Sequence, residues 1–358
     1  MDTSVMITLG FLIFAIVMFA WEKIPLSITA MVVAVGLHLS GVLSAREAFA
    51  GFVDPNVLLF MGMFVIGEAF FATGVAVGVG NVVHKFAKTE TSLLVAVMMI
   101  TGILSGFLSN TGTAAVLIPV IIGICKKSGF KQTKLLMPLV FAAAMGGNIS
   151  LIGAPGNMIA QAGLQQAGLG SFNFFDYGLV GLPILIVGTI FYATIGKRFL
   201  PDAPSHQPDG AFEGNDDYSH VPSWKKWTAA IILILTVVAM IFEKQLGVKL
   251  YVSAWIGALV LVATNVISET AAVKSIDMKT IMLFAGSMAL GDAMVKTGTG
   301  SVIADIIVNS LGASPSPIVV LAVIFVLGVF MTNFMSNTAT CALLVPIGLS
   351  LASQLGFD

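Results

Sequence analysis

The sequence predicts an all-α membrane protein that crosses the bilayer many times and is built from two inverted repeats. Of its 358 residues, 57% are hydrophobic and 10% are charged, and the mean hydropathy is +1.00. Soluble globular proteins carry about 25% charged residues, so this chain holds more apolar sequence than a water-soluble core could bury. We therefore expect lipid to be the solvent of the fold.

The sequence offers few residues for catalysis or for binding a metal or cofactor. The net charge of −1 gives no sign of a nucleic-acid partner. Cys125 and Cys341 lie in apolar runs and the four histidines are scattered, so neither a disulfide framework nor a metal cluster is expected. The sequence motifs of metalloproteases and serine hydrolases are absent. We expect a protein that is not an enzyme and needs no cofactor.

Two apolar segments, 92–124 and 317–352, are too long for one span, which takes about 20 residues. A Ser-Asn-Thr triplet interrupts each of them, at 109–111 and 336–338. We interpret each as a re-entrant helical hairpin, because non-helical backbone at membrane depth is tolerated only inside protein or beside a water-filled cavity. The apolar segments are 5–20, 25–43, 57–82, 92–124, 135–164, 178–196, 227–242, 250–267, 280–295, 300–312 and 317–352.

The segment 135–164 carries two helix-breaking stretches, Gly-Gly-Asn at 146–148 and Gly-Ala-Pro-Gly-Asn at 153–157. Glycine and proline in an apolar run predict a helix that is broken at mid-membrane. The hydrophilic, proline-rich stretch at 200–223 predicts a linker between the repeats.

The two halves of the chain resemble each other. Residues 59–74 and 283–298 are identical at 7 of 16 positions, and residues 107–119 and 334–346 at 8 of 13. The two hairpins are expected to open from opposite sides, which makes the repeats inverted. This arrangement is typical of secondary transporters that bind their substrate at the repeat interface.

We divide the chain into a first inverted repeat at 1–199, a cytoplasmic linker at 200–225 and a second inverted repeat at 226–358. The second repeat is expected to be incomplete, because the counterpart of the 146–157 break would fall near 373–384 and the sequence ends at Asp358. Half of a second cation site would then be missing.

Basic residues predict the orientation in the inner (plasma) membrane. With 92–124 as a hairpin, 13 of the 17 Lys and Arg residues lie on one side. The positive-inside rule makes that side cytoplasmic and places the N-terminus outside. The 13 residues are Lys23, Lys85, Lys88, Lys126, Lys127, Lys131, Lys134, Lys197, Arg198, Lys225, Lys226, Lys274 and Lys279.

The Ser-Asn-Thr tips offer hydroxyl and amide oxygens together with freed backbone groups. Such oxygens suit a hard cation like sodium, and the N–H ends of half-helices suit a carboxylate. The alternative is that these side chains only hydrogen-bond neighbouring helices as packing contacts. The recurrence of the intact triplet in both halves favours binding.

The paired triplets resemble those of the divalent anion:sodium symporter (DASS) family, the sodium-coupled dicarboxylate and citrate carriers of the ion transporter superfamily. The stretch 153–157 is similar to the family's Gly-(Ser/Thr)-Pro-Pro-Asn break, and the resemblance covers essentially the whole chain. Ala154 departs from the family pattern, in which many members carry a hydroxyl thought to touch substrate.

The resemblance implies a homodimer that works by elevator-like alternating access, with sodium as the coupling ion. It implies sodium ligands at Ser105, Ser109, Asn110, Gly153, Thr332, Ser336 and Asn337. It implies substrate contacts at Asn110, Thr111, Ala154, Pro155, Asn157, Asn337 and Thr338.

The leading interpretation is a carrier that couples sodium to uptake of a small di- or tricarboxylate. A sodium-independent anion exchanger, a sodium/proton antiporter and an oxyanion permease of the same superfamily remain alternatives, and an intramembrane enzyme is the alternative from another class. Glu68 and Asp292 are repeat-equivalent acids inside apolar segments. Intramembrane carboxylates are costly, so these two are expected to carry protons, pair structurally with a helix end, or be solvated near an interface.

Overall fold

Every regular element in the described part of the chain is a helix. The computed structural model describes residues 2–76, 78, 89–201, 218–311 and 316–356. Four of its helices are long and apolar enough to cross a membrane, and eight shorter helices are also apolar. The predicted all-α fold is therefore confirmed.

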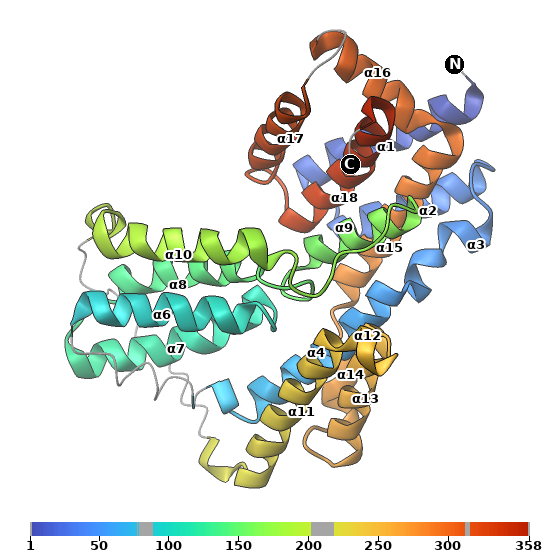
Figure 1. Ribbon diagram of the computed structural model, residues 1–358. Coiled ribbons are helices and arrows are strands. Elements are labelled where there is room, and N and C mark those ends of the chain that lie inside the picture. The colour runs from blue at the N-terminus through green and yellow to red at the C-terminus, as the bar shows by residue number, and fades with distance from the viewer. Residues whose placement is uncertain (1, 77, 79–88, 202–217, 312–315, 357–358) are drawn as a thin grey trace. The chain divides into compact units, whose positions relative to one another are not determined.

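The chain forms two compact units, each of which draws on both halves of the sequence (Figure 1). Unit 1 comprises Met1–Leu58, Met158–Ser171 and Asp277–Asp358, and unit 2 comprises Leu59–Asn157 and Phe172–Ile276.

Unit 1 is built around α2 (Leu26–Leu39) and α15 (Met278–Thr297), which α1 (Thr3–Trp21) and α18 (Asn337–Leu355) cover. Small residues let the backbones approach closely: a Cβ at Gly51 would lie 2.6 Å from the Cα of Ala285. Lipid is as apolar as these side chains, so close packing rather than exclusion of water holds them together. The remaining helices of this unit are α3 (Ala45–Ala48), η1 (Ala50–Val53), α16 (Thr299–Leu311) and α17 (Pro317–Met331).

Unit 2 contains a bundle of four helices, coloured cyan to yellow-green in Figure 1. These are α6 (Glu90–Ser105), α7 (Asn110–Ser128), α8 (Thr133–Gly146) and α10 (Gly178–Thr194). Their shared core consists of aliphatic side chains and one thiol, among them Leu94, Met98, Leu117, Ile121, Cys125, Leu139 and Leu185.

A second group of helices in unit 2 packs through small residues. A Cβ at Gly62 in α4 (Pro55–Ala72) would lie 2.7 Å from the Cβ of Ala254 in α13 (Leu250–Ala263). Helix α11 (Ser223–Ile241) packs on α13 as well. The short elements are α12 (Glu243–Leu246), α14 (Glu269–Ser275), η2 (Gly196–Arg198) and η3 (Tyr218–His220), and α9 (Pro155–Gln166) starts in unit 2 and continues in unit 1.

The longer helices overlap the apolar segments expected from the sequence, whereas the short helices α3, α12 and α14 lie outside them. The segment 92–124 forms the pair α6 and α7, the segment 317–352 forms α17 and α18, and the segment 135–164 is interrupted between α8 and α9. Whether each pair re-enters on one side of the membrane stays a prediction. Most of the linker at 200–225 and the end of the 57–82 segment lie outside the described residues.

Candidate functional site

The tip of the first hairpin lies between the end of α6 at Ser105 and the start of α7 at Asn110. Ser109 is the N-cap of α7, and its Oγ accepts a hydrogen bond from the Gly112 backbone N–H at 3.1 Å. Serine at this position satisfies a donor that the helix itself cannot pair. Ser105 is buried, Asn110 is half-buried, and Ser109 and Thr111 are exposed.

One end of the Asn110 amide faces three oxygen atoms. Its Oδ1 position lies 2.7 Å from Ser105 Oγ, 3.1 Å from the Ala143 carbonyl oxygen and 3.2 Å from the Gly153 carbonyl oxygen. Ser105 Oγ also lies 2.7 Å from the Ala143 carbonyl, and a hydroxyl has a single proton to donate. Two arrangements relieve this crowding of lone pairs: the amide turns so that its Nδ2 donates to the oxygens, or a cation lies among them.

Side chains within the break between α8 and α9 donate hydrogen bonds to main-chain carbonyl oxygens that the helices leave unpaired. Asn157 Nδ2 donates to the carbonyl oxygens of Gly147 and Ser150, at 2.9 Å in each case. Ser150 Oγ donates to the Gly106 carbonyl in the turn of the hairpin. Because each unsatisfied backbone group in lipid costs several kcal/mol, these contacts allow the chain to unwind here.

Two glycines bring the break against the hairpin tip. A Cβ at Gly147 would lie 2.5 Å from Asn110 Oδ1, and a Cβ at Gly153 would lie 2.5 Å from the Gly147 carbonyl oxygen. Gly147 has a φ of −56°, which any residue adopts, so lack of space rather than backbone conformation requires glycine there.

Four helix ends converge on this cluster. Helices α6 and α8 end at Ser105 and Gly146, where their carbonyl ends are partly negative. Helices α7 and α9 begin at Asn110 and Pro155, where their N–H ends are partly positive. Ala154 and Pro155 are half-buried beside this start of α9. The arrangement therefore provides a place suited to a cation and, next to it, a place suited to an anion, and neither uses a charged side chain.

The tip of the second hairpin, in unit 1, repeats the local pattern of the first. Thr332 Oγ1 donates to Asn337 Oδ1, the counterpart of the contact between Ser105 and Asn110. Ser336 is the N-cap of α18 and accepts from the Ala339 N–H at 3.1 Å. Asn337 is exposed and Thr338 is half-buried.

The two intramembrane acids lie in separate units, Glu68 in α4 of unit 2 and Asp292 in α15 of unit 1. Both are half-buried. Their expected part in proton transfer, structural pairing or simple solvation stays a prediction.

The structure brings Ser105, Asn110 and Gly153 into one cluster, and Ser109 caps the helix that starts there. Sequence reasoning missed the Ala143 carbonyl and the Ser150 hydroxyl. A hydroxyl inside a glycine-rich break could have been noticed. A main-chain carbonyl carries no signal in the sequence.

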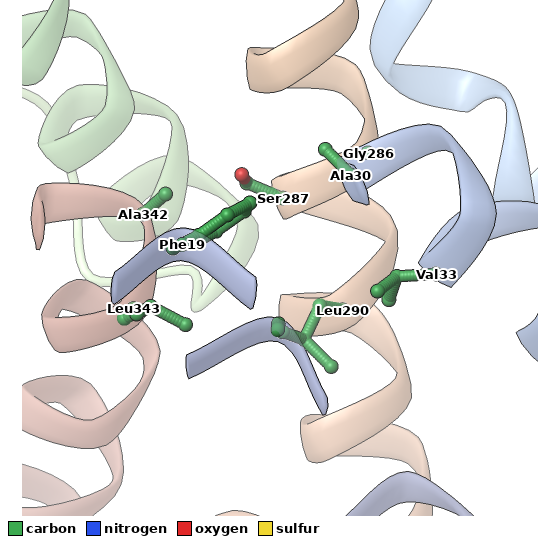
Figure 2. Close-up of a pocket in the computed structure, with 9 residues that line it drawn as sticks. Phe19, Ala30, Val33, Gly286, Ser287, Leu290, Ala342 and Leu343 are labelled. Atoms are coloured by element: carbon green, nitrogen blue, oxygen red, sulfur yellow. The ribbon is translucent and has the colours of Figure 1, made fainter. Parts of the chain in front are cut away.

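A small cavity in unit 1 is not a candidate site. It measures about 10 Å³ and lies between α1, α2, α15 and α18 (Figure 2). Its polar side chain, Ser287, already donates to the Leu283 carbonyl at 2.7 Å. A space of this size holds one water molecule at most, and its walls are apolar.

The chain resembles known transporters. The family described as citrate transporter (CitMHS) matches residues 16–358. Over 211 residues the chain is 33% identical to the uncharacterized transporter YfbS of Escherichia coli, a match that covers 59% of this chain and 35% of that protein. An uncharacterized transporter of Haemophilus influenzae is 27% identical over 367 residues, covering 97% and 77% of the two chains. The sodium-dependent dicarboxylate transporter SdcS of Staphylococcus saprophyticus is 24% identical over 363 residues, covering 91% and 69%.

Proposed function

Since this chain belongs to the citrate transporter (CitMHS) family, we propose that it couples sodium to the transport of a small di- or tricarboxylate anion. Its family and its apolar helices make it a multi-pass membrane transporter and not an enzyme. A similarity to a sodium-dependent dicarboxylate transporter supports the choice of sodium and of a dicarboxylate.

The oxygen cluster around Asn110 is the observation that carries the proposal. Its Oδ1 lies 2.7 Å from Ser105 Oγ and 3.2 Å from the Gly153 carbonyl. Adjacent oxygens around a hard cation are spaced by about 3.3–3.7 Å when each lies at 2.3–2.6 Å from the ion, so these oxygens would have to move apart by about 1 Å or less to hold one. The carbonyl ends of α6 and α8 favour the cation at this place.

The anion is proposed to lie at the N–H ends of α7 and α9. There Asn110, Thr111, Ala154 and Pro155 surround the partly positive helix starts. The second tip, in unit 1, offers a matching set of side chains for a second sodium, in Thr332, Ser336, Asn337 and Thr338. No buried charge is needed, which suits a site at membrane depth.

We further infer alternating access by movement of the hairpin-bearing parts against a dimeric scaffold in the inner (plasma) membrane. The predicted inversion of the two repeats supports this inference, since two pseudo-equivalent halves can exchange roles on the two sides of the membrane.

The test is uptake of radiolabelled succinate and citrate by liposomes that contain the purified protein. An inward sodium gradient should drive uptake, and replacing sodium by choline should abolish it. Equal uptake in choline into liposomes preloaded with the unlabelled anion would indicate an exchanger and overturn sodium coupling.

Asn110→Ala should abolish the sodium-dependent uptake while leaving expression intact. Asn173→Ala removes an exposed amide from a loop of the same unit and should leave uptake unchanged. Normal sodium dependence in Asn110→Ala would contradict the assigned cation site.

A further inference from the structure

Ser150 ties the break to the turn of the first hairpin. Its side chain is 0% exposed, and its Oγ donates to the Gly106 carbonyl, directly after Ser105 in the chain. The same oxygen accepts from the Ile152 N–H at 3.3 Å. A single buried hydroxyl thus links the α6–α7 turn to the segment that leads to Gly153.

Asn157 closes the break from its other end. It is 6% exposed, and its Nδ2 donates to the carbonyls of Gly147 and Ser150 at 2.9 Å each. Its own carbonyl accepts from the Tyr177 hydroxyl at 2.7 Å. An amide nitrogen has two protons, so both are already used and none is left for a substrate carboxylate.

Gly153 lies between Ser150 and Asn157 in the sequence. Its carbonyl oxygen is 3.2 Å from the Asn110 amide, whereas the cation ligands Ser105 and Asn110 belong to a different segment of the chain. The distance between the two segments therefore decides whether their oxygens can reach one ion.

We propose that Ser150 and Asn157 are positioning residues that clamp the break against the hairpin tip, so that the Gly153 carbonyl stays aimed at Asn110. This inference rests on the proposed sodium site. It assigns Asn157 to the support of the cation site rather than to contact with the anion.

The clamp itself can be tested without sodium. Hydrogen exchange of the peptide that covers 147–158 is measured in choline chloride for Ser150→Ala and Asn157→Leu. Both variants remove a donor that holds the break, so this peptide should exchange faster than in the wild type. Thr189→Ala is the matched control, because its buried hydroxyl donates at 2.7 Å to Leu185 in its own helix α10. It should not change exchange at 147–158.

The effect on the cation site is read from uptake in the same variants. Ser150→Ala and Asn157→Leu should raise the sodium concentration for half-maximal uptake by up to about tenfold, the upper end of the contribution of one neutral hydrogen bond. The KM for the anion at saturating sodium should change by less than about twofold, because no anion contact is removed. Tyr177→Phe is a milder variant that removes one hydroxyl, and it should shift the sodium response in the same direction by a smaller factor.

Unchanged exchange at 147–158 in both Ser150→Ala and Asn157→Leu would overturn the clamp. So would an Asn157→Leu variant in which the KM for the anion rises and the sodium response stays normal, since that is the behaviour of a substrate ligand. A wild-type protein whose uptake ignores sodium, with exchange still accelerated in the variants, would refute the proposed function and leave the clamp of the break standing.

Discussion

Replacing Gly147 by alanine tests whether the Asn110 amide must occupy its observed place. The added methyl group would lie 2.5 Å from Oδ1 and 2.8 Å from Nδ2 of Asn110. Gly147 has a helical φ of −56°, so alanine is compatible with the backbone and only the space is contested. The substitution therefore acts on the amide of Asn110 without removing it.

The size of the effect follows from the distances. Non-bonded carbon and oxygen atoms are comfortable at about 3.5 Å, so the amide must retreat by about 1 Å. That movement takes its 2.7 Å contact with Ser105 and its 3.2 Å approach to Gly153 out of hydrogen-bonding range. Overpacking a tight site costs about 1–3 kcal/mol. If this cost destabilises the sodium-bound state alone, it lowers the sodium affinity by a factor of about 5–150.

The assay is a sodium titration of succinate or citrate uptake in liposomes. Gly123→Ala is the matched control, because a Cβ at this position in α7 meets nothing within 4 Å. It should transport with a normal sodium response. A normal sodium response in Gly147→Ala would refute the reasoning.

Two further predictions concern the orientation and the surface of the protein. In a Cys125→Ser, Cys341→Ser background, Lys126→Cys should not react with a membrane-impermeant maleimide in intact cells, because the basic loops are predicted to be cytoplasmic, and labelling from outside would reverse the orientation. Lys296 Nζ donates to both carboxylate oxygens of Glu47 at 2.9 Å, and this hydrogen bond, with those from Ser44, lowers the pKa of Glu47 from 4.5 to about 2. A carboxyl pKa that is lowered on folding stabilises the fold at pH values above 4.5, and this stabilisation is lost as the pH falls from 4.5 through about 2. This pair should therefore give the melting temperature no pH dependence between about pH 6 and 8. The pair is exposed, so Lys296→Met should lower the melting temperature only slightly, and choline chloride should screen the difference. A melting temperature that changes between about pH 6 and 8, and no longer does so in Glu47→Gln, would contradict this account.

The ends of the hairpin helices could be predicted from the sequence because serine is a strong N-cap. Ser109 and Ser336 stand directly before α7 and α18, and each accepts from the N–H three residues later. The break between α8 and α9 was likewise marked by its glycines and by Pro155, which starts α9. Local chemistry determines these features, so a single sequence reveals them.

Which helices are buried within the protein could not be predicted in the same way. Helices α15 and α17 are both apolar, yet α15 is buried on nearly all sides while α17 is exposed along most of its length. In lipid an apolar side chain is equally stable against another helix or against an acyl chain, so hydropathy does not separate the two cases. The use of Asn157 was missed for a related reason: its donors pair with carbonyls whose positions depend on how the break folds.

Asn110 suggests how a neutral site can couple a cation to an anion. Its side chain belongs to the oxygen cluster with Ser105 and Gly153, while its backbone starts α7, whose N–H end is proposed to face the carboxylate. A cation that holds the Asn110 amide in place also orders the first turn of α7. Conversely, an anion bound at that turn holds the amide in place. The two bound species then stabilise each other through one residue, and by linkage each raises the affinity for the other by the same factor. On the proposed function, attraction between the sodium and the carboxylate would add to this effect. Coupling of this kind needs no titratable side chain, so on this mechanism Glu68 and Asp292 are not required for sodium-driven transport.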